Sequence, residues 1–513
     1  IKAGCRVTEQ ESLIDSSLLR MMKLLCGGVV FTLALSYYIY MPLPATVSEP
    51  WKLILVGATF RTATHLLSGL RTFSHHCGGH VCGGCVGGCM YEWPRMDRRH
   101  LTTKLSSLLT LHLAHSDPLA LLDWSHHLSG KKADFSHSLG LVHHVRVLTL
   151  AMTSFESFVP SEFEDLQTED TEFHGVQVRV YMPQHRDGTL RRAVMFIHGG
   201  GWSLGLPKLG SYDVLCRKMA VMLKAVVVTV DYRMVPDVHF PVQYEECLQA
   251  ARHFLQPDVL AHYSVDPERV AVCGDSAGGN LAAAITQRIG QDIRNNDDVR
   301  NSNVDHLKNN SSGGGGVKFK LQVLVYPVLQ PLDFNTASYQ QNWGVPILYR
   351  DLMARYWLEY LGADSSLLHT VLLNNHTALD ESRANPHRSK VNWTSMIPEH
   401  MRKHYTAVFP RTGSPSVLQD IPAMLDPRAA PLLAEQEVLK TVPDTYIMTC
   451  EHDVLRDDGM MYVRRLELAG VSVTHRHYDD CFHGCVSFAF WPLYFSVGIR
   501  ATDDYIAWLH THL

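Results

Sequence analysis

The chain has 513 residues, more than an ordinary single domain, and 46% of them are hydrophobic, which is enough for a full apolar core. Its formal net charge of −5 offers no electrostatic basis for binding nucleic acid, so we expect no nucleic-acid partner.

The first predicted element is a mostly apolar segment at 24–42, close to the minimum length for a membrane-spanning helix. Arg20 and Lys23 lie on its N-terminal side, so the positive-inside rule keeps the amino terminus cytosolic and sends the rest of the chain into the lumen. We therefore expect a single-pass signal anchor. A cleaved signal peptide and a buried helix are the alternatives. Residues 1–20 form a leader of doubtful status.

The next region, 43–165, does not alternate between strand and helix patterns, and we assign it to an N-terminal cap. It contains a Cys/Gly-rich insertion at about 71–131. A structural zinc site usually takes its four ligands from two separated pairs, whereas the candidates here share one glycine-rich run. We therefore expect no metal, and interpret the insertion as disordered or as an aberrant translated segment. The candidate ligands are His75, His76, His80, Cys82, Cys85 and Cys89.

A predicted strand at 193–197 ends in His198 and a run of three glycines. Glycines after a strand have no side chains to shield their backbone N–H groups, so these N–H groups can point at one oxygen. Together with the N–H of Ala277, the groups of Gly199, Gly200 and Gly201 are candidates for an oxyanion hole, three of them acting at once. A merely flexible glycine loop is the alternative.

Residues 274–279 read Gly-Asp-Ser-Ala-Gly-Gly, between a short apolar strand at 269–273 and a helix beginning near Asn280. Strand, G-x-S-x-G and helix in this order predict a nucleophile elbow, a turn too sharp for side chains next to the serine. Ser276 is thus the predicted nucleophile, and the other motif residues are His198, Gly274, Asp275 and Gly278. A serine hydroxyl needs a base and an orienting acid to react.

Both partners follow Ser276, in the order that α/β-hydrolases use. Asp453 lies just after a predicted strand at 444–450, and we expect it to be the acid, with Glu451 as the weaker candidate. His483 follows the last predicted strand and is the expected base. We interpret His475 and His477 as ordinary strand residues, and expect Asp457 and Asp458 to cap the next helix.

The pattern of alternating strands and helices predicts an α/β fold, a mainly parallel sheet with helices on both faces. The catalytic domain spans 166–513 and includes a second cap segment at 334–440. Its aromatic residues either line an acyl pocket or belong to the core; they are Trp343, Tyr349, Tyr356 and Trp357. Further strands are expected near 176–182, 225–230, 321–326 and 471–477, and helices near 211–223, 243–255, 280–290, 459–469 and 501–511.

The HGGG run, the segment 231–241 and the elbow together resemble the hormone-sensitive-lipase group of α/β-hydrolases. Shorter segments narrow the resemblance to its arylacetamide deacetylase branch; they are 332–336, 392–395, 450–459 and 495–500. The likeness covers roughly 22–70 and 160–513. One departure is Cys481, where the family usually has glycine before Phe-His-Gly. If that backbone needs a positive φ, cysteine would cost about 1 kcal/mol.

The resemblance implies an α/β-hydrolase with an acyl-enzyme mechanism and no cofactor, acting on neutral lipid esters at the endoplasmic reticulum membrane. Cholesteryl esters and 1-O-alkyl-2-acetylglycerol ethers are the expected substrates. It also implies a disulfide between Cys216 and Cys450, which an oxidising lumen permits. The glycosylation candidates are Asn309, Asn310, Asn375 and Asn392, of which the last two resemble family sites.

Three alternatives stay open at this point. A general short-chain carboxylesterase or arylacetamide deacetylase uses the same machinery on smaller substrates. An amidase or acyltransferase differs only in the bond cleaved or in the acceptor. A non-catalytic receptor on the same fold would have lost its base, whereas His483 is present here.

Overall fold

The computed structural model describes residues 43–58, 166–184, 188–302, 316–377, 386–408, 413, 416–490 and 492–513. All of them belong to one of the two units into which the chain divides, 1–58 with 152–513. The predicted anchor at 24–42 and the Cys/Gly-rich insertion lie outside the described residues. Within the described ranges, no helix is both long and apolar enough to cross a bilayer.

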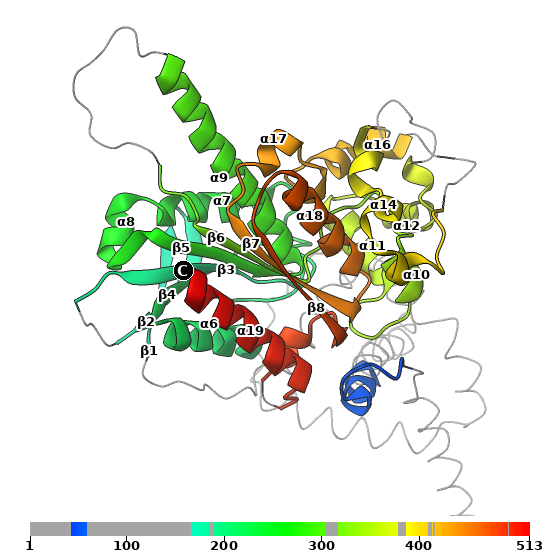
Figure 1. Ribbon diagram of the computed structural model, residues 1–513, viewed down its shortest axis with the longest axis horizontal. Helices are drawn as coiled ribbons and strands as arrows, with labels where there is room; N and C mark the ends of the chain where they lie inside the picture. Colours follow the sequence, from blue (N-terminus) through cyan, green and yellow to red (C-terminus); the bar gives the residue numbers. More distant parts are fainter. Residues whose placement is uncertain are drawn as a thin grey trace, which may run out of the picture. The chain divides into compact units, whose positions relative to one another are not determined.

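An eight-stranded sheet forms the centre of the domain, in the order β1-β2-β4-β3-β5-β6-β7-β8 (Figure 1). The pairs β1–β2 and β2–β4 are antiparallel, and every other neighbouring pair is parallel. The predicted mainly parallel sheet is thereby confirmed. The strands are β1 (Leu166–Phe173), β2 (Val176–Pro183), β3 (Arg191–Ile197), β4 (Ala225–Val230), β5 (Val265–Asp275), β6 (Leu321–Val325), β7 (Asp444–His452) and β8 (Val473–Phe482).

The strand missing from the sequence prediction is β1. Its sequence, LQTEDTEF, is polar between two apolar ends, and only Leu166 and Phe173 are buried. An edge strand of an antiparallel pair has little apolar surface to hide, so its hydrophobic pattern is weak. Two of the central strands, in contrast, are buried along their whole length. Every residue of β4 and β6 is buried, as expected for parallel strands covered on both faces.

Helices cover both faces of the sheet (Figure 1). On one face α6 contacts β2 and β4, and α19 packs beside it against β8. On the other face α7, α9 and α18 pack against the strands. The helices are α6 (Gly210–Leu223), α7 (Val242–Phe254), α8 (Pro257–His262), α9 (Ala277–Ser302), α10 (Ala337–Gln341), α11 (Arg350–Tyr360), α12 (Leu368–Leu372), α14 (Trp393–Met396), α15 (Glu399–Arg402), α16 (Ser416–Asp420), α17 (Gln436–Leu439), α18 (Arg456–Leu468) and α19 (Ser496–His512).

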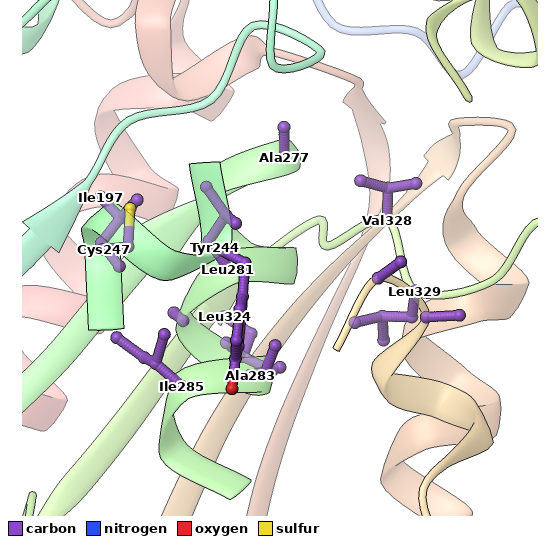
Figure 2. Packing of buried hydrophobic residues seen from close by; sticks show 14 of the residues in the cluster. Ile197, Tyr244, Cys247, Ala277, Leu281, Ala283, Ile285, Leu324, Val328 and Leu329 are labelled. Atoms are coloured by element: carbon purple, nitrogen blue, oxygen red, sulfur yellow. The ribbon is translucent and has the colours of Figure 1, made fainter. Parts of the chain in front are cut away.

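The helix α9 begins directly after Ser276, and its first turns are buried in the main hydrophobic core. Figure 2 shows its apolar side chains, Leu281 and Ile285 among them, in the cluster that also holds Leu324 of β6. Burying such a side chain contributes roughly 1.5–3 kcal/mol each. The nucleophile therefore lies on a turn whose two flanking elements are both fixed by the core.

Two further segments are added to the sheet and its covering helices. Helices α10 to α17 all fall between β6 and β7, where the sequence predicts the second cap segment. The N-terminal residues 43–58 are attached to β8: the N–H of Ser48 donates to the carbonyl of Asp480 at 2.9 Å. Thr46 Oγ1 lies 2.9 Å from Nε2 of His452, at the end of β7. The N-terminal segment therefore lies at the edge where β7 and β8 end.

Candidate active site

Ser276 occupies the turn between β5 and α9 with φ of +52°, a left-handed conformation that a non-glycine residue adopts rarely. Its N–H donates to the carbonyl of Val325 at 2.9 Å, which ties the turn to β6. A Cβ on Gly274 would overlap the backbone of Gly278, and a Cβ on Gly278 would overlap the carbonyl of Ile197. The glycines are therefore required by close backbone approach, which is the physical basis of the motif.

The three predicted triad residues meet in the structure. His483 Nε2 lies 2.9 Å from Ser276 Oγ, and His483 Nδ1 lies 2.8 Å from Asp453 Oδ2. Asp453 is fully buried, and its other oxygen accepts the N–H of Leu455 at 2.8 Å. In the tautomer that donates Nδ1–H to Asp453, His483 Nε2 is placed to accept the proton of Ser276 Oγ. The ring of Tyr326 lies 4.7 Å from that of His483.

Glu451, the weaker acid candidate, faces other partners. Its Oε1 accepts from Nη1 of Arg456 at 3.0 Å, and its Oε2 lies 3.2 Å from Nε2 of His477. Burial alone would raise the pKa of Glu451, but the contacts with His477 and Arg456 lower it to about 2. As the sequence predicts, His475 and His477 are strand residues of β8, and both contact Thr449 Oγ1.

The expectation that Asp457 and Asp458 cap a helix is wrong. The helix α18 begins at Arg456, three residues before the expected start at 459, so both aspartates lie inside it, and it has no side-chain cap. Both carboxylates are fully buried and bind other segments: Asp457 accepts the N–H of Ser338 at 2.7 Å, and Asp458 accepts the N–H of Leu329 at 2.9 Å. Burial raises the pKa of Asp458 to about 7. These long-range contacts outweigh the local preference for capping.

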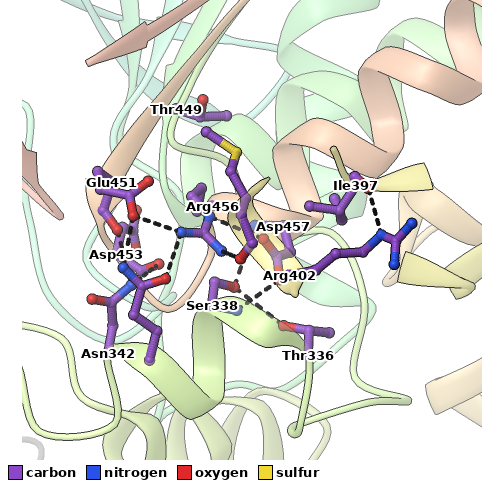
Figure 3. A network of polar contacts seen from close by, with 12 residues as sticks. Thr336, Ser338, Asn342, Ile397, Arg402, Thr449, Glu451, Asp453, Arg456 and Asp457 are labelled. Carbon is purple, nitrogen blue, oxygen red and sulfur yellow. Dashed lines mark hydrogen bonds and ion pairs between the residues drawn. The ribbon is translucent and has the colours of Figure 1, made fainter. Parts of the chain in front are cut away.

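A polar network surrounds the strand end that carries the acid (Figure 3). Its centre is Arg456, whose side chain is fully buried and donates to Glu451 and Asp457 at 3.0 Å each. Asn342 donates its amide to the carbonyls of Glu451 and Asp453, at 2.9 and 3.1 Å. The backbone around Asp453 is therefore held from the segment between β6 and β7.

The glycine run lies beside the elbow, but one of its N–H groups is already used. Gly199 donates to Asp275 Oδ1 at 2.8 Å and contacts the Tyr212 hydroxyl at 3.1 Å. Within the described ranges, the N–H groups of Gly200, Gly201 and Ala277 show no such partner. Three of the four predicted donors therefore stay available for an oxyanion, and Gly199 takes a supporting role.

Two buried side chains keep the glycine run in place. His198 stacks on Tyr232 with ring centroids 4.4 Å apart, and its Nδ1 lies 3.0 Å from the carbonyl of Gly199. Burial lowers the pKa of His198 to about 4, so the ring is neutral at pH 7. Asp275 is buried as well, and desolvation raises its pKa to about 6.

The expected disulfide between Cys216 and Cys450 is wrong: both cysteines are free and buried. Instead, Cys481 is bonded to Cys485, four residues further along the chain. The backbone of Cys481 is not among those with a positive φ, so the cysteine carries no left-handed strain. A disulfide needs the right distance and direction between two Cβ atoms, and sequence spacing alone does not give this.

A metal site requires several ligand atoms close together. In the part of the chain that the structure describes, the group with three potential ligands is Cys450, Cys481 and Cys485, whose sulfur atoms lie within 4.8 Å of one another. Two of these sulfurs are joined in the disulfide, which leaves one thiol for a metal. The zinc candidates at 75–89 lie outside the described residues.

The remaining predicted residues are the four aromatic candidates of the second cap segment and the four glycosylation candidates. Tyr356 packs under Gly201, and Trp357 is buried against Trp202, whereas Trp343 and Tyr349 are exposed. Of the four sequons, Asn392 is exposed and Asn375 is half-buried. Asn309 and Asn310 lie outside the described residues.

Sequence reasoning missed Tyr212, Asn342, Arg456 and Cys485. Tyr212 and Asn342 act through contacts with residues 63 and 111 positions away, which no local pattern reveals. Arg456 contacts Glu451 and Asp457 nearby and also Gln341, 115 positions away. Cys485 did carry a signal, because Cys481 and Cys485 are placed symmetrically around His483.

Comparison with known proteins agrees with this geometry. The model of a family described as alpha/beta hydrolase fold matches 194–387 and 410–487. The chain is 42% identical to neutral cholesterol ester hydrolase 1 of Bos taurus over 494 residues, 96% of this chain and 100% of the relative. Arylacetamide deacetylase of Bos taurus is 36% identical over 493 residues, again 96% and 100% of the two chains.

Among solved structures, the hyperthermophilic esterase from the archaeon Pyrobaculum calidifontis matches with a TM-score of 0.50 and 26% identity, over 72% of this chain and 91% of that one. The relatives are named hydrolases and esterases, and the site described above has the constellation that such enzymes require. The chain therefore belongs to the α/β-hydrolase family, as a carboxylesterase-type hydrolase related to the neutral cholesterol ester hydrolases and arylacetamide deacetylases.

Proposed function

We propose that this enzyme hydrolyses carboxylic esters of neutral lipids, cholesteryl esters or 1-O-alkyl-2-acetylglycerol ethers, through an acyl-enzyme on Ser276. The observation that carries the mechanism is the pair of hydrogen bonds from Asp453 to His483 and from His483 to Ser276, at 2.8 and 2.9 Å. The choice of lipid esters is supported by the 42% identity to neutral cholesterol ester hydrolase 1 over nearly the whole chain.

In the proposed reaction, Ser276 Oγ attacks the ester carbonyl while its proton passes to His483 Nε2. Asp453 stabilises the imidazolium that results. The N–H groups of Gly200, Gly201 and Ala277 donate to the oxygen of the tetrahedral intermediate, and each is expected to contribute about 10²–10³ in rate. The protonated His483 then gives its proton to the leaving alcohol, and a water activated by the same ring releases the acid.

The proposed site of action is the endoplasmic reticulum membrane, with a single-pass anchor at 24–42 and a lumenal catalytic domain. Arg20 and Lys23 before this apolar segment support that orientation. Glycan at Asn375 or Asn392 would require a lumenal domain, so a mobility shift on deglycosylation tests the topology.

The second candidate function is hydrolysis of short acyl esters or arylacetamides. It is favoured by the 36% identity to arylacetamide deacetylase over 493 residues. Its triad chemistry is identical, and only the substrate separates it from the first candidate.

The test compares microsomes that express the wild type, Ser276→Ala, His483→Gln or His475→Gln. Each is offered p-nitrophenyl acetate, cholesteryl oleate and 1-O-alkyl-2-acetylglycerol. His475 is the matched control, since it lies on β8, the strand that leads to His483, but contacts Thr449 rather than the triad. We expect Ser276→Ala and His483→Gln to lose about 10⁴-fold or more on every substrate, and His475→Gln to keep its activity.

Serine-dependent release of oleate or acetate from the two lipids supports the proposal. Cleavage of p-nitrophenyl acetate alone moves the function to a short-chain esterase. Transfer of the acyl group to an added alcohol, with little free acid, identifies an acyltransferase. Unchanged turnover by Ser276→Ala contradicts the whole mechanism.

A further inference from the structure

The loop that carries the catalytic base is closed by a covalent bond. Cys481 and Cys485 lie two residues before and two residues after His483, and a disulfide joins them with Cα atoms 6.6 Å apart. Cys481 is the next-to-last residue of β8, and Cys485 is the first residue of a short 3₁₀ helix, so the bond connects the strand to that helix. All three residues, His483 included, are buried. The covalent loop closed by the disulfide therefore contains His483 and only its two neighbours, Phe482 and Gly484.

A third cysteine lies against this bond. The sulfur atoms of Cys450, Cys481 and Cys485 are all within 4.8 Å of one another, and Cys450 is a free thiol. Cys450 belongs to β7 and stands three positions before Asp453. The cluster thus lies between the strand that leads to the acid and the loop that carries the base.

The loop is held by noncovalent contacts as well as by the disulfide. Phe482 pairs with His452 of β7 and packs against Phe495, and the Ser487 N–H donates to the carbonyl of Gly484 at 3.0 Å. Gly484 has φ of +81°, and a Cβ on it would meet only the side chains of Ile347 and Phe488, at 3.5 and 3.8 Å. The backbone of Cys485 also lies against Gly498 of α19, where no Cβ fits, and the disulfide adds a covalent connection across His483 to these contacts. A triad hydrogen bond of 2.9 Å tolerates little displacement, because a misplacement of about 1 Å can cost up to ~10² in rate.

We propose that Cys450, Cys481 and Cys485 form a thiol–disulfide site that positions the catalytic base: the closed Cys481–Cys485 bond holds His483 at Ser276, and its reduction by a dithiol loosens the loop and lowers kcat. This inference rests on the serine-hydrolase function of the same site. Cys481 and Cys485 are positioning residues, because they act on the reaction only through His483.

The redox step balances with a dithiol as the reductant. One thiolate of the dithiol attacks a sulfur of the Cys481–Cys485 bond, that bond breaks, and a mixed disulfide forms. The second thiolate of the dithiol then closes its own disulfide. Two electrons and two protons pass to the protein, which now has three neighbouring thiols at Cys450, Cys481 and Cys485.

Cys450 determines what happens on reoxidation. Three thiols allow three pairings, and the two that include Cys450 link the strand of the acid to the loop of the base. Burial raises the pKa of the Cys450 thiol well above its ordinary value, and the charges of Asp453 and Asp480 add to this. A protonated thiol is a poor nucleophile, so the Cys481–Cys485 pairing is expected to persist in the resting enzyme.

The experiment uses the full chain in microsomes, with p-nitrophenyl acetate as substrate and dithiothreitol as the dithiol. Ser276→Ala at each dithiothreitol concentration supplies the background, which includes direct thiolysis of the ester. Alkylation followed by mass spectrometry of the peptide around His483 reports whether the bond is open. Two further variants are Cys481→Ala/Cys485→Ala, which lacks the bond, and Cys247→Ala, which removes a buried thiol outside the cluster.

We expect reduction to lower the kcat of the wild type and of Cys247→Ala by about three- to tenfold with KM within about twofold, and oxidised dithiothreitol to restore it. The double variant should have the same kcat as the reduced wild type, and dithiothreitol should not change it. An open bond with unchanged kcat, a double variant with wild-type kcat, or a bond that stays closed in excess dithiothreitol each overturns the proposal. Should the double variant fail to fold, the wild-type titration decides alone. If the wild type shows no serine-dependent hydrolysis, the hydrolase function itself has failed.

Discussion

Asp275 and Gly199 are joined by a hydrogen bond of 2.8 Å, from the Gly199 N–H to Asp275 Oδ1. The residue before the nucleophile therefore holds the loop that supplies the oxyanion donors. The Tyr212 hydroxyl lies 3.2 Å from the other carboxylate oxygen and completes the connection. Nucleophile and oxyanion hole are thus positioned by one buried carboxylate.

This carboxylate should make stability depend on pH. Desolvation raises the pKa of Asp275 from 3.8 to about 6, so the folded protein holds this proton more tightly than the unfolded chain does. Stability from this group is therefore present at low pH and is lost as pH rises from about 4 to 6. A shift of about two units corresponds to about 3 kcal/mol.

The matched variant is Asp275→Asn, which has no charge to desolvate. We expect its free energy of unfolding, relative to the wild type, to rise by about 3 kcal/mol between pH 4 and pH 7. Denaturant titrations at several pH values measure this difference. A difference that does not change with pH would show that Asp275 is not the group responsible.

The effect of substitution on kcat should distinguish the two candidates for the catalytic acid, Asp453 and Glu451. Asp453→Asn leaves the volume unchanged but removes the acceptor that fixes the tautomer of His483, and we expect kcat to fall by about 10⁴. Glu451→Gln should lower kcat by less than about tenfold, because Glu451 contacts Arg456 and His477 rather than the base. Steady-state kinetics on p-nitrophenyl acetate decide between them, and equal losses would contradict the assignment of Asp453.

Buried charge around the acid should make Arg456 important for stability. Arg456→Met removes the partner of the buried Asp457 and of the half-buried Glu451, and we expect a loss of about 3–5 kcal/mol. Arg464→Met is the control on the same helix, because Arg464 is half-exposed and pairs with Glu467 at only 3.4 Å. Its effect should stay within about 0.5 kcal/mol. Chemical denaturation of the two variants checks this, and similar losses would argue against a special role for the buried pairs.

The close contact of Gly278 with the carbonyl of Ile197 predicts that alanine substitutions at Gly278 and at Gly344 have different effects on activity. Gly278→Ala places a Cβ against the carbonyls of Ile197 and His198, which cannot move without shifting the glycine run. We expect activity to fall by at least about 10²-fold, since the oxyanion donors are displaced. Gly344→Ala meets no atom within 4 Å and should behave as the wild type. Full activity of Gly278→Ala would mean that the elbow backbone is free to relax.

Local chemistry explains why much of the site was predictable from the sequence. The elbow is defined by glycines next to Ser276, because only they permit its close backbone contacts. Asp453 and His483 follow the last two strands, and the carboxyl ends of parallel strands share one edge of the sheet. Order along the chain was therefore enough to bring the three residues together. The central strands were found for a similar reason, since burial on both faces leaves an uninterrupted apolar run.

Contacts between distant segments were not predictable in this way. Asp457 and Asp458 stand where caps are expected, but they bind Ser338 and Leu329, more than 110 residues away. Cys216 and Cys450 do not pair as expected, because a bond between them depends on where α6 and β7 come to lie. The candidate nucleophile, base and acid could be predicted from local signatures, because each lies at a turn or a strand end. The tertiary structure alone decided which groups hold them, because hydrogen bonds, ion pairs and disulfides require proximity that only the packed fold creates.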